Sequence, residues 1–91
     1  MMQRKHIQVF GTVQGVGFRH HTELIAKKLG IFGTVQNVED YVDIYAQGDE
    51  EKIKSFINKV IAGASPASSV SDYSIEDLDV TNRYSEFKTI Y

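Results

Sequence analysis

The chain contains the stretch Val13-Gln14-Gly15-Val16-Gly17-Phe18-Arg19, which joins a predicted strand to a predicted helix through two glycines and ends on an arginine. Glycine adopts backbone φ values that other residues avoid, so consecutive amide N–H groups can converge on one point. The helix start adds unpaired donors and a positive dipole end, and Arg19 adds a planar fork that matches two phosphate oxygens. The stretch therefore predicts a phosphate-binding cradle.

A plainer interpretation stays open from these residues alone. Gly15 and Gly17 could only shape a tight turn before a helix, with Arg19 as a solvated residue of the first helical turn. Nucleotide-binding loops are disfavoured, because the glycines do not follow the GxGxxG spacing and no Gly-Lys-Ser/Thr follows them.

The elements around this stretch follow from hydrophobic periodicity. Alternation predicts a strand over 7–11, and apolar residues at helical spacing, ended by Gly30, predict a helix over about 20–29. Residues 32–38 and 42–47 read as two strands of a hairpin, with Asp40 and Tyr41 marking the turn.

The second half of the chain also contains a helix followed by strands. Glu50 and Glu51 begin a helix with an apolar face that Gly63 and Pro66 end. A strand over 70–78 follows, in which Val70 is out of parity with the later apolar residues, so a bulge is expected between them. A turn over 81–84 leads to a short strand over 85–91.

This order, βαββαβ plus a short C-terminal strand, predicts an α+β fold. The economical packing is a ferredoxin-like two-layer sandwich, a mostly antiparallel sheet with two helices on one face. With 91 residues, 42% of them hydrophobic, we expect a single domain over 1–91.

Composition narrows the possible functions. The chain has no cysteine, which excludes disulfides, thiolate nucleophiles and cysteine-bound zinc. The apolar stretch behind the basic start is interrupted by Gln8 and Gly11, so we expect no signal peptide, no membrane span and a cytoplasmic location.

A net charge of −2 argues against a general nucleic-acid binder. Residues 1–30 carry five Lys or Arg and one Glu, so an anion could be drawn to this third of the chain.

The segment from Gly11 to Arg19, followed by the one from Leu29 to Asn37, resembles the paired signature of the acylphosphatase family. These are small enzymes that hydrolyse the carboxyl-phosphate anhydride. The similarity extends over nearly the whole chain, including an Ala67-x-x-Val70-x-x-Tyr73-x-Ile75 stretch and the end that contains Phe87.

The resemblance implies a role for each matched residue. Arg19 corresponds to the residue that binds the substrate and stabilises the transition state, and Asn37, at the end of the neighbouring strand, to the one that positions the attacking water. Phosphate oxygens would be held by the backbone N–H groups of Gln14, Gly15, Val16, Gly17 and Phe18.

The implied substrate is a small acyl phosphate, with inorganic phosphate as product and competitive inhibitor. Neither metal nor other cofactor is expected, and no nucleic-acid or membrane partner. The protein is expected to be a monomer.

Some residues depart from the family pattern. After Asn37 the chain lacks the Asp-Gly turn that members commonly have, and Ile90 stands where a basic residue often does. His20 and His21 lie beside the cradle, but the motif assigns them no role. Tyr41, Tyr45 and Tyr73 are expected to pack on the sheet rather than stack on bases.

Two alternatives remain. One is a non-catalytic ferredoxin-like module that binds a small anion or another protein. The other is a domain that handles carbamoyl phosphate in a maturation protein; such a domain resembles acylphosphatase but normally belongs to a far longer chain, and this chain also lacks cysteine pairs.

Overall fold

The computed structural model describes residues 1–91 and contains five strands and two helices. Their order confirms the expected βαββαβ pattern with a C-terminal strand. The elements are β1 (Met2–Thr12), α1 (Phe18–Leu29), β2 (Phe32–Val38), β3 (Tyr41–Asp49), α2 (Glu50–Ile61), β4 (Ser69–Leu78) and β5 (Phe87–Ile90).

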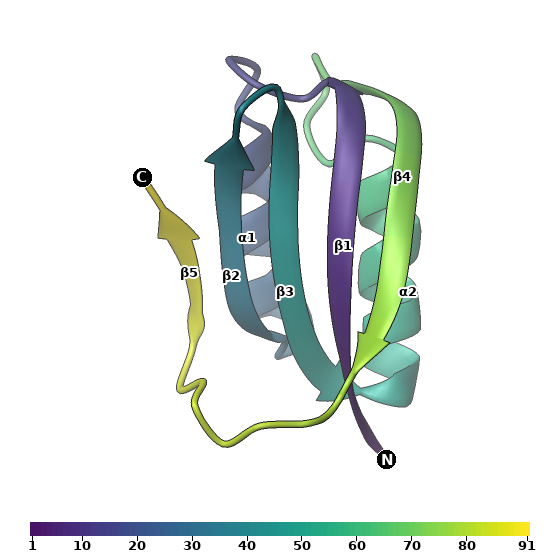
Figure 1. Ribbon diagram of the computed structural model, residues 1–91, viewed down its shortest axis with the longest axis vertical. Coiled ribbons are helices and arrows are strands. Elements are labelled where there is room, and N and C mark those ends of the chain that lie inside the picture. The colour runs from purple at the N-terminus through teal and green to yellow at the C-terminus, as the bar shows by residue number, and fades with distance from the viewer.

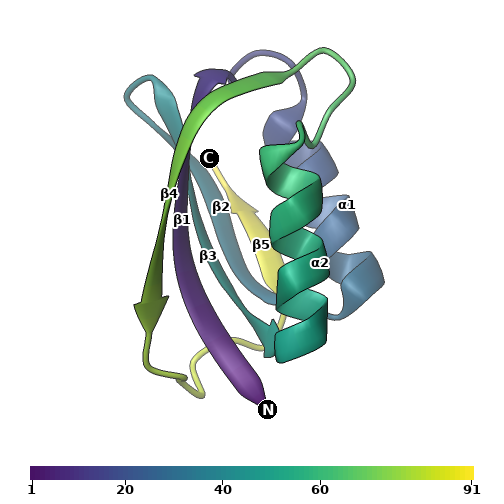
Figure 2. The ribbon, with the colours of Figure 1, turned by 90° about the vertical axis from the view of Figure 1, so that its right-hand side faces the viewer.

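The five strands form one sheet in the order β4-β1-β3-β2-β5 (Figure 1). All neighbouring pairs are antiparallel except β2 and β5, which are parallel. Both helices cover the same face of the sheet (Figure 2), which confirms the two-layer, ferredoxin-like sandwich. One expectation needs correction: β3 lies between β1 and β2, so the strand that carries Asn37 is not the neighbour of the strand that leads into the cradle.

Most element boundaries agree with the sequence, and the differences have tertiary causes. β1 begins at Met2 rather than near residue 7, because Met2 to Val9 pair with β3 along its length. The β2–β3 turn consists of Glu39 and Asp40, one residue earlier than expected, and Tyr41 already pairs with Val38. The expected bulge is present where the β1–β4 register shifts, between Phe10 and Gly11.

The core lies between the sheet and the helices. On α1 the fully buried residues are Phe18, Thr22 and Ala26, whereas Ile25 and Leu29 are only partly buried against the core. The apolar face of α2 is buried as expected through Ile53, Phe56 and Val60. Neither helix is long and apolar enough to cross a membrane.

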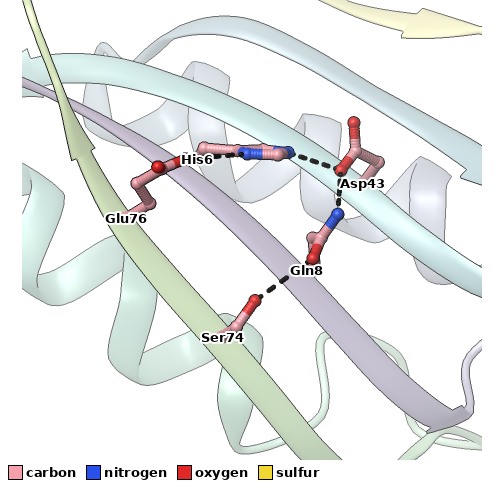
Figure 3. Close-up of polar contacts among 5 residues, drawn as sticks. All are labelled: His6, Gln8, Asp43, Ser74 and Glu76. Carbon is pink, nitrogen blue, oxygen red and sulfur yellow. Dashed lines mark hydrogen bonds and ion pairs between the residues drawn. The ribbon is translucent and has the colours of Figure 1, made fainter.

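The face of the sheet without helices carries a polar network (Figure 3). His6 Nε2 lies 2.6 Å from Asp43 Oδ1, and His6 Nδ1 lies 3.5 Å from Glu76 Oε1. Gln8 joins it by donating to Asp43, and the Tyr45 ring stacks on the His6 ring with centroids 4.3 Å apart.

The other two tyrosines differ from each other. Tyr41 packs against Phe10, with ring centroids 5.2 Å apart, and thus lies on the sheet as expected. Tyr73 is 47% exposed, so it is only about half covered. It lies on β4, an edge strand of the sheet, where fewer neighbours are available to cover it.

Candidate active site

The loop between β1 and α1 has the backbone conformation that its glycines suggest. Gly15 has φ 74° and Gly17 has φ 75°, both in the left-handed region. A Cβ atom added to Gly15 would meet nothing within 4 Å, so it is the backbone conformation, and not a lack of space, that favours glycine there. These two glycines, separated by Val16, curl the chain directly before the first helical turn.

The start of α1 is electrostatically suited to an anion. Gly17 is the N-cap residue, it provides no side-chain cap, and the first turn contains no acidic residue. By contrast, α2 follows Asp49 and begins with Glu50 and Glu51. The first amide N–H groups of a helix have no partner within it and form the positive end of the dipole. The α1 start therefore offers donors that no carboxylate of its own helix satisfies.

A cavity of about 150 Å³ opens at this helix start. It contains the two side chains that the resemblance singles out, Arg19 and Asn37, although they stand 18 positions apart in the chain. The full lining is Val13, Gly15, Gly17, Phe18, Arg19, His20, Asn37 and Tyr91. The fold thus brings the predicted arginine, the predicted asparagine and the glycine loop to one place.

Arg19 is held at the edge of the cavity by the C-terminal residues. Its Nη1 donates a hydrogen bond of 3.1 Å to the carbonyl oxygen of Ile90. Its guanidinium carbon lies 4.8 Å from the centre of the Tyr91 ring. At position 90, where the family often has a basic side chain, this chain thus contributes a backbone carbonyl. A guanidinium has five N–H donors, so the contact with Ile90 leaves others available.

Asn37 reaches the cavity because of strand parity. Val35 is fully buried under the helices, so Asn37, two residues later on β2, lies on the same face. Its Oδ1 atom is buried and has no hydrogen-bond partner in the protein. Buried acceptors of this kind usually bind a donor such as water.

Two residues of the predicted cradle do not line the cavity. The Gln14 side chain instead donates from Nε2 to the carbonyl oxygens of Glu39 and Tyr41, at 3.0 and 2.9 Å. Val16 packs against the hydrophobic core. Any contribution of these two residues to phosphate binding would come from their backbone, as the resemblance implies.

The cavity also contains two side chains, Tyr91 and His20, to which the family motif assigns no role. Tyr91 is placed there by the parallel pairing of β5 with β2, in which Ile90 lies opposite Gln36 and the next residue therefore comes level with Asn37. No local pattern in the sequence announces that pairing. His20 lies next to Arg19 in the chain, and its ring meets the His21 ring edge-on, with centroids 5.6 Å apart. His21 turns away from the cavity, with Nδ1 2.9 Å from the carbonyl oxygen of Gly17.

The arrangement can bind a tetrahedral anion and hold a water beside it. Nowhere in the structure do three His, Asp or Glu side chains gather closely enough to hold a metal ion. The cavity is lined by the glycine loop, one guanidinium, one carboxamide, one imidazole and the Tyr91 ring.

Comparisons with known proteins identify relatives of this chain. The sequence model of the acylphosphatase family matches residues 5–89. The chain is 57% identical to an acylphosphatase of Staphylococcus haemolyticus (strain JCSC1435), over 98% of this chain and 100% of that one. The crystal structure of acylphosphatase from Bacillus subtilis superimposes with a TM-score of 0.92 at 37% identity, covering 100% of both chains.

A longer protein contains the same fold. The crystal structure of full-length HypF in its phosphate- and nucleotide-bound form matches 100% of this chain with a TM-score of 0.91 and 31% identity, but the match covers only 12% of HypF. The Staphylococcus haemolyticus and Bacillus subtilis proteins, which match along their whole length, are acylphosphatases. The family model that matches residues 5–89 and the relatives that match over their full length show that this chain belongs to the acylphosphatase family.

Proposed function

We propose that this chain hydrolyses the carboxyl-phosphate anhydride bond of small acyl phosphates, giving a carboxylate and inorganic phosphate. Family membership supports the reaction. The observation that carries the proposal for the site is the meeting of Arg19, Asn37 and the glycine loop around one cavity.

In this proposal the substrate's phosphoryl group lies in the loop between β1 and α1. Backbone N–H groups of residues 14–18 donate to its oxygens, and the positive end of the α1 dipole stabilises its charge. Arg19 adds charge-assisted hydrogen bonds that strengthen as negative charge builds up in the transition state. The Ile90 carbonyl and the Tyr91 ring keep the guanidinium at the cavity edge before substrate arrives.

Asn37 positions the attacking water in line with the scissile bond. A carboxamide can donate to and accept from one water, and the free Oδ1 of Asn37 is the acceptor this role requires. An amide is a poor base, so the water's proton passes to a phosphate oxygen of the substrate. The leaving carboxylate is a weak base and departs without a general acid.

Two further proposals, on inhibition and on metal independence, follow from the same site. Inorganic phosphate should act as a competitive inhibitor, because it fits the cradle that holds the phosphoryl group. The reaction needs no metal, because positioning and electrostatic stabilisation suffice for such a leaving group. We also propose that residues 1–91 act as one domain, as a monomer, in the cytoplasm.

The test is release of phosphate from an aromatic acyl phosphate, in the presence of a chelator. Arg19→Ala should lower kcat/KM by about 10²- to 10⁴-fold, the loss typical of oxyanion donors and arginine fingers. Arg19→Lys should not restore it, because an ammonium lacks the planar fork. Asn37→Ala should lower kcat while phosphate still binds. Arg83→Ala and Asn58→Ala, both at exposed positions, serve as controls.

Three results would contradict the proposal in different ways. Phosphate binding without any turnover would instead support the non-catalytic binding module. Normal turnover by Asn37→Ala would contradict the water-positioning role alone. Activity that disappears with the chelator and returns with a metal ion would contradict metal independence.

A further inference from the structure

We infer that the side chain of Gln14 is a positioning residue, which sets Asn37 in place relative to the phosphate cradle. The inference rests on the function proposed above. Gln14 lies in the loop between β1 and α1, and its Nε2 donates to the carbonyl oxygens of Glu39 and Tyr41 at 3.0 and 2.9 Å. Both acceptors belong to the tip of the β2–β3 hairpin.

The sheet topology makes this link important. β3 separates β1 from β2, so no backbone hydrogen bonds join the strand before the cradle directly to the strand that carries Asn37. The β1–β3 pairing ends at Val9 opposite Val42, short of the loop. Gln14 provides the only hydrogen bonds between residues 13–17 and 37–41.

The backbone of the hairpin tip is strained, so hydrogen bonds from the Gln14 side chain can hold it in one conformation. Glu39 has φ 52°, a left-handed conformation that a residue with a side chain adopts only at a cost in free energy. Such a conformation persists where the surrounding structure holds it in place. One amide group of Gln14 binds the carbonyls on both sides of Asp40, so it fixes the path of the turn two residues after Asn37.

The consequence concerns the chemical step and not the binding of phosphate. The cradle uses the backbone of Gln14, which any side chain leaves in place. The position of Asn37 relative to the phosphorus depends on the hairpin, and a displacement of about 1 Å can lower a rate by about 10²-fold. Loss of the Gln14 amide should therefore lower kcat and leave the affinity for phosphate unchanged.

The experiment compares Gln14→Met with Gln36→Met, measuring kcat for an aromatic acyl phosphate and Kd for inorganic phosphate by calorimetry. Methionine keeps the length of the side chain and removes both donors. Gln36 lies on the same strand as Asn37 and makes no side-chain hydrogen bond, so its replacement should change neither quantity. For Gln14→Met, kcat should fall by about 10- to 100-fold while the Kd for phosphate stays within about threefold of wild type.

A second variant tests the donor itself. Gln14→Glu has the same shape, but its carboxylate cannot donate to two carbonyls at neutral pH. Its kcat relative to wild type should rise as the pH falls towards about 4.3, where the carboxyl group takes up a proton and regains one donor. A ratio that does not change with pH would overturn the inference.

Two other results would also overturn it: a kcat of Gln14→Met equal to that of wild type, or an equal loss of kcat and phosphate affinity. Measuring Arg19→Ala and Asn37→Ala in the same assay distinguishes an error in the Gln14 inference from an error in the proposed function. If both lose activity while Gln14→Met keeps it, the inference about Gln14 alone is wrong. If both keep activity, the proposed site itself is wrong.

Discussion

One carboxylate oxygen of Glu23, on α1, accepts two hydrogen bonds from Thr89 of β5, from its backbone amide at 2.9 Å and from its hydroxyl at 2.6 Å. The hydroxyl contact is the largest cause of a lowered pKa of Glu23, and Lys27 lowers this pKa further. β5 is a short edge strand that ends at Ile90 and is followed by Tyr91, the two residues that contact Arg19. The pair therefore fastens the C-terminal strand to the helix that carries Arg19.

The first prediction concerns the strength of this contact. Glu23→Gln should lower the free energy of unfolding by about 1 kcal/mol, because it replaces a charge-assisted acceptor with a neutral one. Denaturant unfolding measures the change. Glu86→Gln is the matched control, because the Glu86 side chain lies just before β5, is mostly exposed and makes only a long contact with Lys88. Equal stabilities of the two variants would show that the Thr89 contact contributes nothing.

The second prediction concerns pH. Because the pKa of Glu23 in the folded protein lies below its ordinary value of 4.5, the folded state binds its proton less readily than the unfolded chain. The stabilisation is complete above pH 4.5 and is lost as the pH falls through the pKa of the folded state. The difference in unfolding free energy between wild type and Glu23→Gln should therefore shrink on acidification. A difference that grows at low pH would contradict the assigned cause.

The third prediction separates backbone strain from ligand binding. Gly15 and Gly30 have similar left-handed φ values, 74° and 72°, and a Cβ at either would meet nothing within 4 Å. Replacement by alanine should therefore cost a similar free energy of unfolding at both sites, about 1 kcal/mol. Only Gly15→Ala should also weaken phosphate binding in calorimetry, because Gly30 lies at the far end of α1. Equal phosphate affinities in the two variants would place the cradle elsewhere.

The fourth prediction concerns Tyr91. Tyr91→Ala removes the ring that lies 4.8 Å from the Arg19 guanidinium but keeps the backbone contact of Arg19 with Ile90. An exposed cation–π contact is worth about 0.5–1 kcal/mol, so the inhibition constant for phosphate should rise by about two- to fivefold. Tyr91→Phe, which keeps the ring, should behave like wild type. If both variants matched wild type, the ring would have no part in positioning Arg19.

The fifth prediction concerns the polar network on the open face of the sheet (Figure 3). His6→Ala should lower the free energy of unfolding by about 1–2 kcal/mol, because it removes the stack on Tyr45 and leaves Asp43 without its closest partner. It should leave kcat unchanged, because the network lies on the opposite face of the sheet from the helices. A loss of kcat in folded His6→Ala would show that the two faces are coupled.

Local sequence patterns were sufficient for the elements and the layers. Apolar periodicity indicated both helices and the first four strands, and the unequal parity of Val70 and the later apolar residues located the bulge on β4. The two glycines before Phe18 indicated the left-handed backbone that the loop adopts. These features depend on residues a few positions apart in the chain, so they can be predicted from the sequence alone.

The tertiary structure alone decided which distant residues meet. The strand order puts β3 between β1 and β2, so the loop before α1 and the hairpin that follows Asn37 are linked through the Gln14 side chain and not through a shared ladder. The parallel pairing of β5 brings Tyr91 to the cavity. Such contacts depend on how the whole sheet closes over its core, because the free energy of pairing two strands is shared among many residues far apart in the chain. No short stretch of sequence contains that information.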